Sequence, residues 1–285
     1  MNINNLKIFI KVADKMSITE AANDLYISQP AVSKAVSNLE NELEIKLFHR
    51  DKKTGLILTD VGKEILLLGR QMLSIENKIF QIAYMEKNLL GGKVKIGSFP
   101  VASTTFLPKA IAIFKKKYPG VDIELMEGTS NQVKKWLEER VIDFGIVISP
   151  FNNFEYKFLL RDRMVGIMPE NHKNIEVIDL NLENENLIFC KAGHELAVSQ
   201  TIKDYKIDLD KSFTVQNAET VISMVNNHVG IGIISEFVLS SVPNNLKTFE
   251  ISPLIETEIG VIAHSFSDLP PVATEFINVI FSDNS

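Results

Sequence analysis

Two side chains in the second half of the sequence have the residue types of a nucleophile and its base. Cys190 and His194 lie four positions apart, and a thiolate activated by an imidazole is a common covalent catalyst. No nucleophile motif at a helix start accompanies them, and His194 is expected in an exposed loop, so a buried strand cysteine is the ordinary interpretation. Because the chain has one cysteine, an internal disulfide is excluded, although sulfenylation stays open. The five histidines have no metal-ligand spacing. We therefore predict no catalytic residue, metal or cofactor, and expect the protein not to be an enzyme.

A second chemistry, the reading of DNA bases, is available to the stretch SITEAANDLYISQPAVSKAVSNLENEL, which runs from Ser17 to Leu43. Ser17 and Glu20 have the capping-box spacing that starts a helix. Ser28 is a second N-cap candidate, and proline is tolerated in the first turn that follows it. Small residues at Ala21 and Ala22 allow close crossing. Apolar residues then resume at Ala31, Val32, Ala35, Val36, Leu39 and Leu43. Two short helices joined by a tight turn are typical of a helix-turn-helix.

The second of these helices has a polar face without any carboxylate. No acidic residue occurs from Ser28 to Asn38, and the predicted solvent face consists of Gln29, Ser33, Lys34, Ser37 and Asn38. Gln and Lys contact base edges in a major groove, and Ser contacts bases or phosphates. An ordinary solvated helix face would have a similar composition, so both interpretations stay open on this face alone.

A basic hairpin is predicted after the helices. Between Lys46 and Lys53 there are four basic residues and one acid, Asp51. Thr54 and Gly55 are expected to form the turn, and residues 56–58 the returning strand. Such a hairpin suits a wing that rests on phosphates, and few other basic residues support it, so dimerisation would have to strengthen binding.

A long helix is expected to begin after Thr59, a further N-cap candidate. Its apolar residues advance in alternating steps of four and three, a heptad pattern, at Val61, Ile65, Leu68, Met72, Ile75, Ile79 and Ile82. A helix of about 30 residues would be about 45 Å long, which favours a partner helix over burial within one chain. A two-fold dimer would read a pseudo-palindromic DNA site.

The N-terminal segment resembles the DNA-binding domain of LysR-type transcriptional regulators. The matching residues are Phe9, Ser17, Ala21, Ala22, Leu25, the run Ser28–Ser33, Leu39, Glu40, Leu43, Leu47, Phe48, Arg50, Leu58, Thr59 and Gly62. The resemblance implies a winged helix-turn-helix over residues 1–58, a dimerising linker helix over 59–90, and an effector-binding domain over 91–285. It also implies that Gln29, Pro30, Ser33 and Lys34 meet DNA, with Arg50 near the wing. The family often has Arg where this chain has Lys34, and Lys lacks the two-pronged contact of Arg.

The predicted DNA-binding residues combine the polar helix face with the basic hairpin. They are Ser28, Gln29, Pro30, Ser33, Lys34, Ser37, Arg50, Lys52 and Lys53.

The C-terminal two-thirds alternate between strand and helix patterns, which predicts an α/β fold with parallel strands. A helix is expected from Thr104 to Tyr118 and another from Asn131 to Arg140. The resemblance continues more loosely here and implies two α/β lobes similar to periplasmic binding proteins, with a ligand cleft between them. We place lobe I at 91–161 and 266–285, and lobe II at 162–265.

Ligands of open α/β sheets bind beyond the carboxyl ends of the strands, and this rule gives a set of candidate effector-binding residues. Ser103 and Thr104 are expected at a helix start, which favours anions. The full set is Ser98, Ser103, Thr104, Thr129, Ser130, Ser149, Lys191, Gly193, His194 and Asn217. For any single member, ordinary helix capping is the favoured explanation. As a group, they suit a small polar or carboxylated metabolite.

Composition limits the remaining classes. The chain has 285 residues, which fits about two domains, and no apolar run long enough for a membrane span. No secretory signal is recognised, so we expect a cytoplasmic protein. The net charge of −6 means that any DNA binding depends on a local patch. We therefore predict a ligand-responsive DNA-binding transcription factor that forms a homodimer or a tetramer. The alternative is a transport-type solute-binding protein.

Overall fold

The computed structural model describes residues 1–51, 55–86, 91–170, 177–181, 186–190, 195–207 and 212–283. The chain divides into two compact units. Unit 1 comprises Met1–Lys87 with Glu139–Val141, and unit 2 comprises Asn88–Glu138 with Ile142–Ser285. Each unit has a hydrophobic core of its own.

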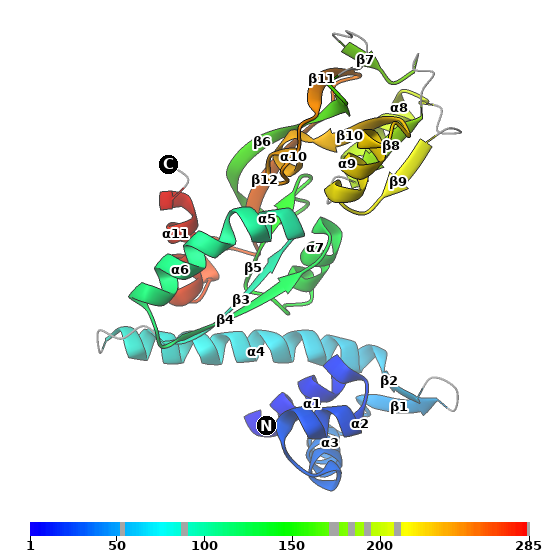
Figure 1. Ribbon diagram of the computed structural model, residues 1–285. Helices are drawn as coiled ribbons and strands as arrows, with labels where there is room; N and C mark the ends of the chain where they lie inside the picture. Colours follow the sequence, from blue (N-terminus) through cyan, green and yellow to red (C-terminus); the bar gives the residue numbers. More distant parts are fainter. Residues whose placement is uncertain are drawn as a thin grey trace. The chain divides into compact units, whose positions relative to one another are not determined.

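Unit 1 begins with three helices, drawn in blue in Figure 1: α1 (Ile3–Lys15), α2 (Ile18–Leu25) and α3 (Gln29–Leu43). Their core contains Phe9, Ala21, Ala22, Val32 and Leu39, all at most 2% exposed. Ala21 and Ala22 have the small side chains that allow α2 to pack closely against its neighbours. Of the apolar residues of α3, Ala31 is exposed, because it lies in the first turn of the helix, where Val32 reaches the core instead.

A two-stranded hairpin and a long helix complete unit 1. The hairpin, called the wing below, pairs β1 (Phe48–Asp51) with β2 (Gly55–Leu58) in antiparallel register. Helix α4 runs over Asp60–Met85 and is capped by Thr59, whose side chain accepts a hydrogen bond from the amide of Gly62. A Cβ atom at Gly62 would overlap the carbonyl oxygen of Leu47, so only glycine permits this close approach of α4 to the wing.

Unit 2 contains a ten-stranded mixed sheet with the central order β4-β3-β5-β12-β6-β10-β8-β9. Its strands are β3 (Gly92–Ser98), β4 (Val121–Glu127), β5 (Phe144–Ile148), β6 (Glu155–Met168), β7 (Val177–Asp179), β8 (Leu187–Cys190), β9 (Ser212–Val215), β10 (Ile231–Ser235), β11 (Lys247–Ser252) and β12 (Glu256–Ala263). The predicted parallel pairing holds for β3 with β4 and β5, and for β8 with β9 and β10. Strands β6 and β12 are antiparallel to each other.

Helices flank the strands of unit 2, and helices and strands together form two groups with separate hydrophobic cores. Figure 1 shows α5 (Pro100–Thr105), α6 (Leu107–Lys117), α7 (Ser130–Glu138) and α11 (Pro271–Asp283) with the strands β3 to β5, and α8 (Glu195–Asp204), α9 (Ala218–Asn226) and α10 (Glu236–Ser240) with β8 to β11. One core contains Phe114 and Phe276, and another contains Val221 and Ile234. The 14-residue strand β6 serves both groups, since it pairs first with β12 and then with β10 and β11.

The predicted start of the helix from Thr104 to Tyr118 is wrong, whereas its end is confirmed. Two helices, α5 and α6, occupy this segment and meet at Phe106. Ser103 and Thr104 therefore lie near the end of α5 rather than at a helix start, and the argument for anion binding at a helix N-terminus does not apply to them. Pro108 in the first turn of α6 is the signal that indicates the second helix start.

Candidate nucleic-acid interface and effector domain

The turn between α2 and α3 is fixed by local capping bonds. Ser17 accepts a hydrogen bond from the amide of Glu20 at 3.3 Å, and Ser28 accepts one from the amide of Ala31 at 3.4 Å. Pro30 lies in the first turn of α3. Both predicted N-caps are confirmed, and together they start α2 and α3 at defined residues.

One face of α3 is open to solvent over most of its length. Among the predicted DNA-binding residues, Ser28, Gln29, Pro30, Lys34 and Ser37 are exposed and Ser33 is half-buried. The Nε2 of Gln29 donates a hydrogen bond to the Oγ1 of Thr19 at 2.8 Å. This bond orients the Gln29 amide and leaves its carbonyl oxygen and one N–H for another partner. The sequence interpretation missed Thr19, whose position in the first turn of α2 was the available signal.

Lys34 differs from the other lysines described in residues 1–51, because it alone has no carboxylate partner within the described chain. Lys7 pairs with Glu76, Lys11 and Lys15 pair with Asp24, and Lys46 pairs with Glu40. The hydrogen bond from Lys15 lowers the pKa of Asp24 below its ordinary value. An unengaged ammonium group therefore projects from the carboxylate-free face of α3.

Glu40 joins α3 to the wing. Glu40 is 7% exposed. Its carboxylate accepts hydrogen bonds from the backbone amides of Leu47 at 2.9 Å and Phe48 at 3.3 Å, and from Lys46 Nζ at 2.7 Å. Burial alone would raise the pKa of Glu40, but the bonds from Lys46 and from the two amides outweigh it and hold the pKa below its ordinary value. The charged form of Glu40 thus fixes where the wing starts relative to α3.

The wing is described in its backbone pairing. Arg50 pairs with Leu56 across the hairpin, but its side chain, like the whole of Lys52 and Lys53, lies outside what the structure describes. Thr59 donates a hydrogen bond to the carbonyl of Lys46 at 2.8 Å. This bond ties the start of α4 to the segment that leads into the wing.

An apolar stripe runs along α4. Six of the seven heptad residues are between 42% and 61% exposed: Val61, Leu68, Met72, Ile75, Ile79 and Ile82. The seventh, Ile65, packs against the core of unit 1. Exposing a row of large aliphatic side chains in water is unfavourable, so the stripe is suited to a partner surface.

Most of the predicted effector-binding residues have structural bonds. The hydroxyl of Ser98 is fully buried and donates to the carbonyl of Phe99, while Ser130 accepts from the amide of Ile148 at 3.1 Å. Ser149 accepts from the amide of Glu258 at 3.0 Å. Thr129 and Asn217 cap helices, and Thr104 donates to the carbonyl of Val101. Lys191, Gly193 and His194 lie outside the described residues.

Ser103 is the exception among these candidates. It is 7% exposed, and its Oγ has no hydrogen-bond partner in the described part of unit 2. A buried hydroxyl without a partner costs free energy. Of the candidates that the structure describes, Ser103 therefore has the hydroxyl that would gain most from a ligand.

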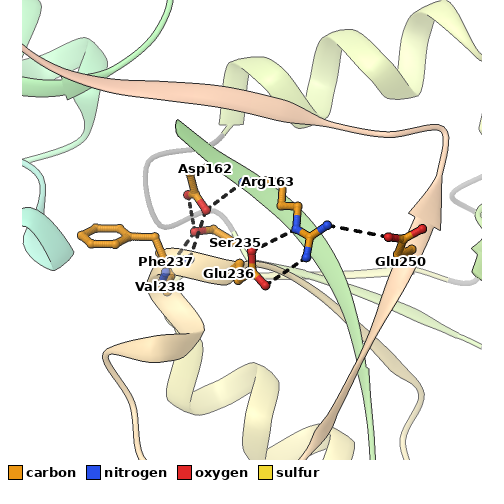
Figure 2. Close-up of polar contacts among 7 residues, drawn as sticks. All are labelled: Asp162, Arg163, Ser235, Glu236, Phe237, Val238 and Glu250. Carbon is orange, nitrogen blue, oxygen red and sulfur yellow. Dashed lines mark hydrogen bonds and ion pairs between the residues drawn. The ribbon is translucent and has the colours of Figure 1, made fainter. Parts of the chain in front are cut away.

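A buried carboxylate organises the point where β6 passes from β12 to β10. Asp162 is 4% exposed and accepts hydrogen bonds from Ser235 Oγ at 2.5 Å and from the amide of Phe237 at 3.0 Å. Figure 2 shows these bonds together with the adjacent ion pair of Arg163 with Glu236. The ring of Phe237 stacks on Phe106, with centroids 5.3 Å apart. Asp162 thus positions α10, which contacts the junction of α5 and α6.

Neither a membrane span nor a metal site is found in the described residues. No described helix is long and apolar enough to cross a membrane, and no three His, Cys, Asp or Glu side chains come together to hold an ion. Cys190 is buried at the end of β8, as expected.

These features define a class of protein: a winged helix-turn-helix joined by a long helix to an α/β domain. Comparison with known proteins agrees. Residues 3–63 match the model of a "Bacterial regulatory helix-turn-helix protein, lysR family", and residues 87–283 match the "LysR substrate binding domain". The chain therefore belongs to the LysR family of transcriptional regulators.

Relatives and solved structures extend over nearly the whole chain. YoaU of Bacillus subtilis (strain 168), described as an uncharacterized HTH-type transcriptional regulator, is 54% identical over 283 residues, which are 98% of each chain. A full-length OxyR variant from Pseudomonas aeruginosa has a TM-score of 0.73 at 23% identity, covering 98% of this chain and 94% of that one. CbnR in complex with its target DNA has a TM-score of 0.61 at 18% identity, covering 100% of both chains. At these identities the two structures show a shared fold.

The protein is accordingly a LysR-type transcriptional regulator with a DNA-binding domain and an effector-binding domain. Regulators of this family bind DNA and small-molecule effectors and form oligomers. The named relative is likewise a transcriptional regulator, and membership of the family decides against the alternative of a transport-type solute-binding protein.

Proposed function

We propose that the chain binds a pseudo-palindromic operator as a homodimer, with α3 of each subunit in a major groove, and that a small polar or carboxylated metabolite modulates this binding. The observation that carries the proposal is the exposed face of α3, which has no carboxylate from Ser28 to Asn38 and one unengaged cation, Lys34. Phosphates and base edges would meet donors there instead of repelling charges.

The proposed roles follow from side-chain chemistry. Gln29, Ser33 and Lys34 contact base edges, and Lys34 does so as a single point charge. Pro30 lies against DNA at the start of α3. The remaining residues of the predicted set contact phosphates or nearby bases: Ser28, Ser37, Arg50, Lys52 and Lys53.

The apolar stripe of α4 supports assembly as a dimer. Its exposed aliphatic side chains are spaced for a heptad seam with a second copy of the helix. Pairing of two linker helices would present two copies of α3 to one duplex, at a separation that matches the half-sites of the operator.

Two features support the effector proposal. Strand β6 pairs with strands of both groups in unit 2, and the buried hydroxyl of Ser103 has no partner among the described residues. A metabolite between the lobes would favour one lobe arrangement over another. This population shift would alter the separation of the two copies of α3. Besides Ser103, the proposed contacts are Ser98, Thr104, Thr129, Ser130, Ser149, Lys191, Gly193, His194 and Asn217.

The recognition proposal is tested with the combined substitution Ser33→Ala and Lys34→Ala in the full chain. The probe is a duplex selected from a random-sequence pool by the unaltered protein, and affinity is measured by fluorescence anisotropy. Loss of these contacts should weaken binding by about tenfold to a thousandfold, and the salt slope should fall by about one. Lys7→Ala is the matched control, since that lysine is already paired with Glu76. Undiminished binding by the double variant would show that α3 does not read the site.

The dimer proposal is tested with Leu68→Asp and Ile75→Asp together. Carboxylates on the stripe should dissociate the dimer, which light scattering detects as a halved mass. Leu254→Asp is the control, because Leu254 is 59% exposed and lies in unit 2. An unchanged mass of the α4 variant would refute the heptad seam.

The effector proposal is tested by thermal unfolding of the full chain in the presence of individual small carboxylic acids. A compound at about 100 times its dissociation constant should stabilise the folded protein by about 2.7 kcal/mol. A true effector must also change the affinity for the selected duplex, because linkage is reciprocal. If every stabilising compound leaves DNA affinity unchanged, the proposed regulation fails.

A further inference from the structure

Tyr26 is the most exposed large hydrophobic side chain in the described residues. It is 95% exposed, whereas every other exposed large hydrophobic side chain in the described residues is at most 61% exposed. A tyrosine ring that stays in water contributes no free energy of apolar burial to folding. The residue therefore contributes little to the core of unit 1, and its exposure needs another explanation.

The backbone at this position accounts for the direction of the side chain but not for its identity. Tyr26 has φ 54° and ψ 37°, and the amide of Ile27 donates to the carbonyl of Ala22 at 3.1 Å. This is a helix ending with a left-handed residue, where Gly or Asn is usually found. The same conformation occurs at Met16 and Glu44, so the turn geometry alone does not single out Tyr26. Its exposure does.

The position of Tyr26 is next to the face of α3 that is proposed to read DNA. It precedes the N-cap of α3 by two residues, and no acidic residue occurs from Tyr26 to Asn38. The nearest preceding carboxylate, Asp24, is paired with Lys15 at 3.0 Å and with Lys11 at 3.6 Å. The start of α3 also carries the positive end of the helix dipole. A phosphate near Tyr26 would therefore meet donors and no unpaired negative charge.

We propose that the phenol hydroxyl of Tyr26 donates a hydrogen bond to a backbone phosphate at the edge of the bases read by α3. Tyr26 is then a positioning residue that holds the start of α3 in register in the groove, which rests on the proposed recognition by α3. Tyrosine is among the side chains that make such phosphate contacts. Because the donor is neutral, the contact releases no counterion of its own. This separates it from the contact of Lys34.

The test compares Tyr26→Phe with the unaltered full chain on the duplex selected in vitro, at several salt concentrations. The variant keeps the ring and loses one hydroxyl in water, so folding should be unaffected. We expect about tenfold weaker binding at every salt concentration and an unchanged slope of affinity against salt. Tyr205→Phe, which removes the hydroxyl of a 57% exposed tyrosine in unit 2, should bind as the unaltered chain does.

Three results would overturn the proposal. Binding by Tyr26→Phe within twofold of the unaltered chain shows that the hydroxyl makes no contact, and a changed salt slope shows that charge was involved. If Ser33→Ala with Lys34→Ala abolishes binding while Tyr26→Phe does not weaken it, the proposal for Tyr26 fails and recognition by α3 stands. A duplex with a methylphosphonate at the contacted phosphate should bind both proteins equally. Unequal binding at every such duplex also contradicts the contact.

Discussion

Replacement of Glu40 tests whether a single carboxylate holds the wing on α3. In the native protein it satisfies the amides of Leu47 and Phe48, which are 0% and 8% exposed as residues. Glu40→Ala removes the one oxygen, Oε1, that accepts from both amides, and leaves two buried donors unpaired. Glu40→Gln keeps an oxygen acceptor but loses the charge.

The magnitude follows from the three bonds. An unsatisfied buried amide costs about 1–3 kcal/mol. The bond from Lys46 adds little, because that lysine side chain is 74% exposed. We therefore expect Glu40→Ala to reduce the free energy of unfolding of unit 1 by about 2–5 kcal/mol and Glu40→Gln by about 1–2 kcal/mol. Glu42→Gln is the matched control: it also lies on α3, is exposed, and pairs with the N-terminal ammonium group.

The assay has two readouts on the full chain. Urea unfolding followed by circular dichroism gives the stability, and hydrogen exchange of peptides that cover residues 44–50 reports the opening of the wing. The pKa of Glu40 is lowered from 4.5, so its stabilising contribution is present above that pH and is lost as the pH falls below it. Glu40→Gln should flatten this acid dependence. Equal stability and exchange in Glu40→Gln and Glu42→Gln would refute the reasoning.

Three further predictions concern unit 2. Burial raises the pKa of Asp143 from 3.8 to about 6, so the stability that this group contributes is present below pH 3.8 and is lost as the pH rises through about 6. Calorimetry should show that Asp143→Asn removes up to about 3 kcal/mol of this pH dependence, and an unchanged pH profile of the variant would contradict the prediction. Ser130→Ala should lower the free energy of unfolding by about 1–2 kcal/mol, while Ser103→Ala, which removes an unpartnered hydroxyl, should leave it unchanged or raise it. If thermal unfolding shows Ser103→Ala to be less stable than Ser130→Ala, the hydrogen bonds are wrongly assigned. Asp162→Ala should lower the free energy of unfolding by about 2–5 kcal/mol, because buried donors lose their acceptor, whereas Glu236→Gln, which weakens the exposed pair with Arg163, should lower it by under about 1 kcal/mol. Equal effects of the two substitutions in urea unfolding would contradict the anchoring of α10 by Asp162.

The elements of unit 1 could be predicted from residues that lie close together in the sequence. Ser17, Ser28 and Thr59 act on amides three residues away, so sequence spacing is sufficient to find them. The heptad pattern of α4 depends only on helix periodicity. Glu40 could not be found in this way, because its partners lie seven and eight residues away across a turn.

Unit 2 was less predictable where strands serve two environments. Strand β6 has a recognisable apolar pattern only in its second half, since the first half contains exposed and charged residues that pair with β12. A strand at a junction follows neither simple alternation nor a continuous apolar run. The break between α5 and α6 was missed although Pro100 and Pro108 mark both helix starts.

The two candidate sites differ in predictability for one physical reason. On α3 the groups proposed to contact DNA are exposed and, at Lys34, unengaged, so residue type indicates their chemistry directly. In unit 2 the hydroxyls at strand ends mostly satisfy backbone amides and carbonyls, as Ser98, Ser130 and Ser149 do. The carboxyl end of a strand needs such bonds whether or not a ligand binds there. A polar residue at that edge therefore predicts a ligand contact only where its atoms remain unpaired, and among the described candidates this condition selects Ser103.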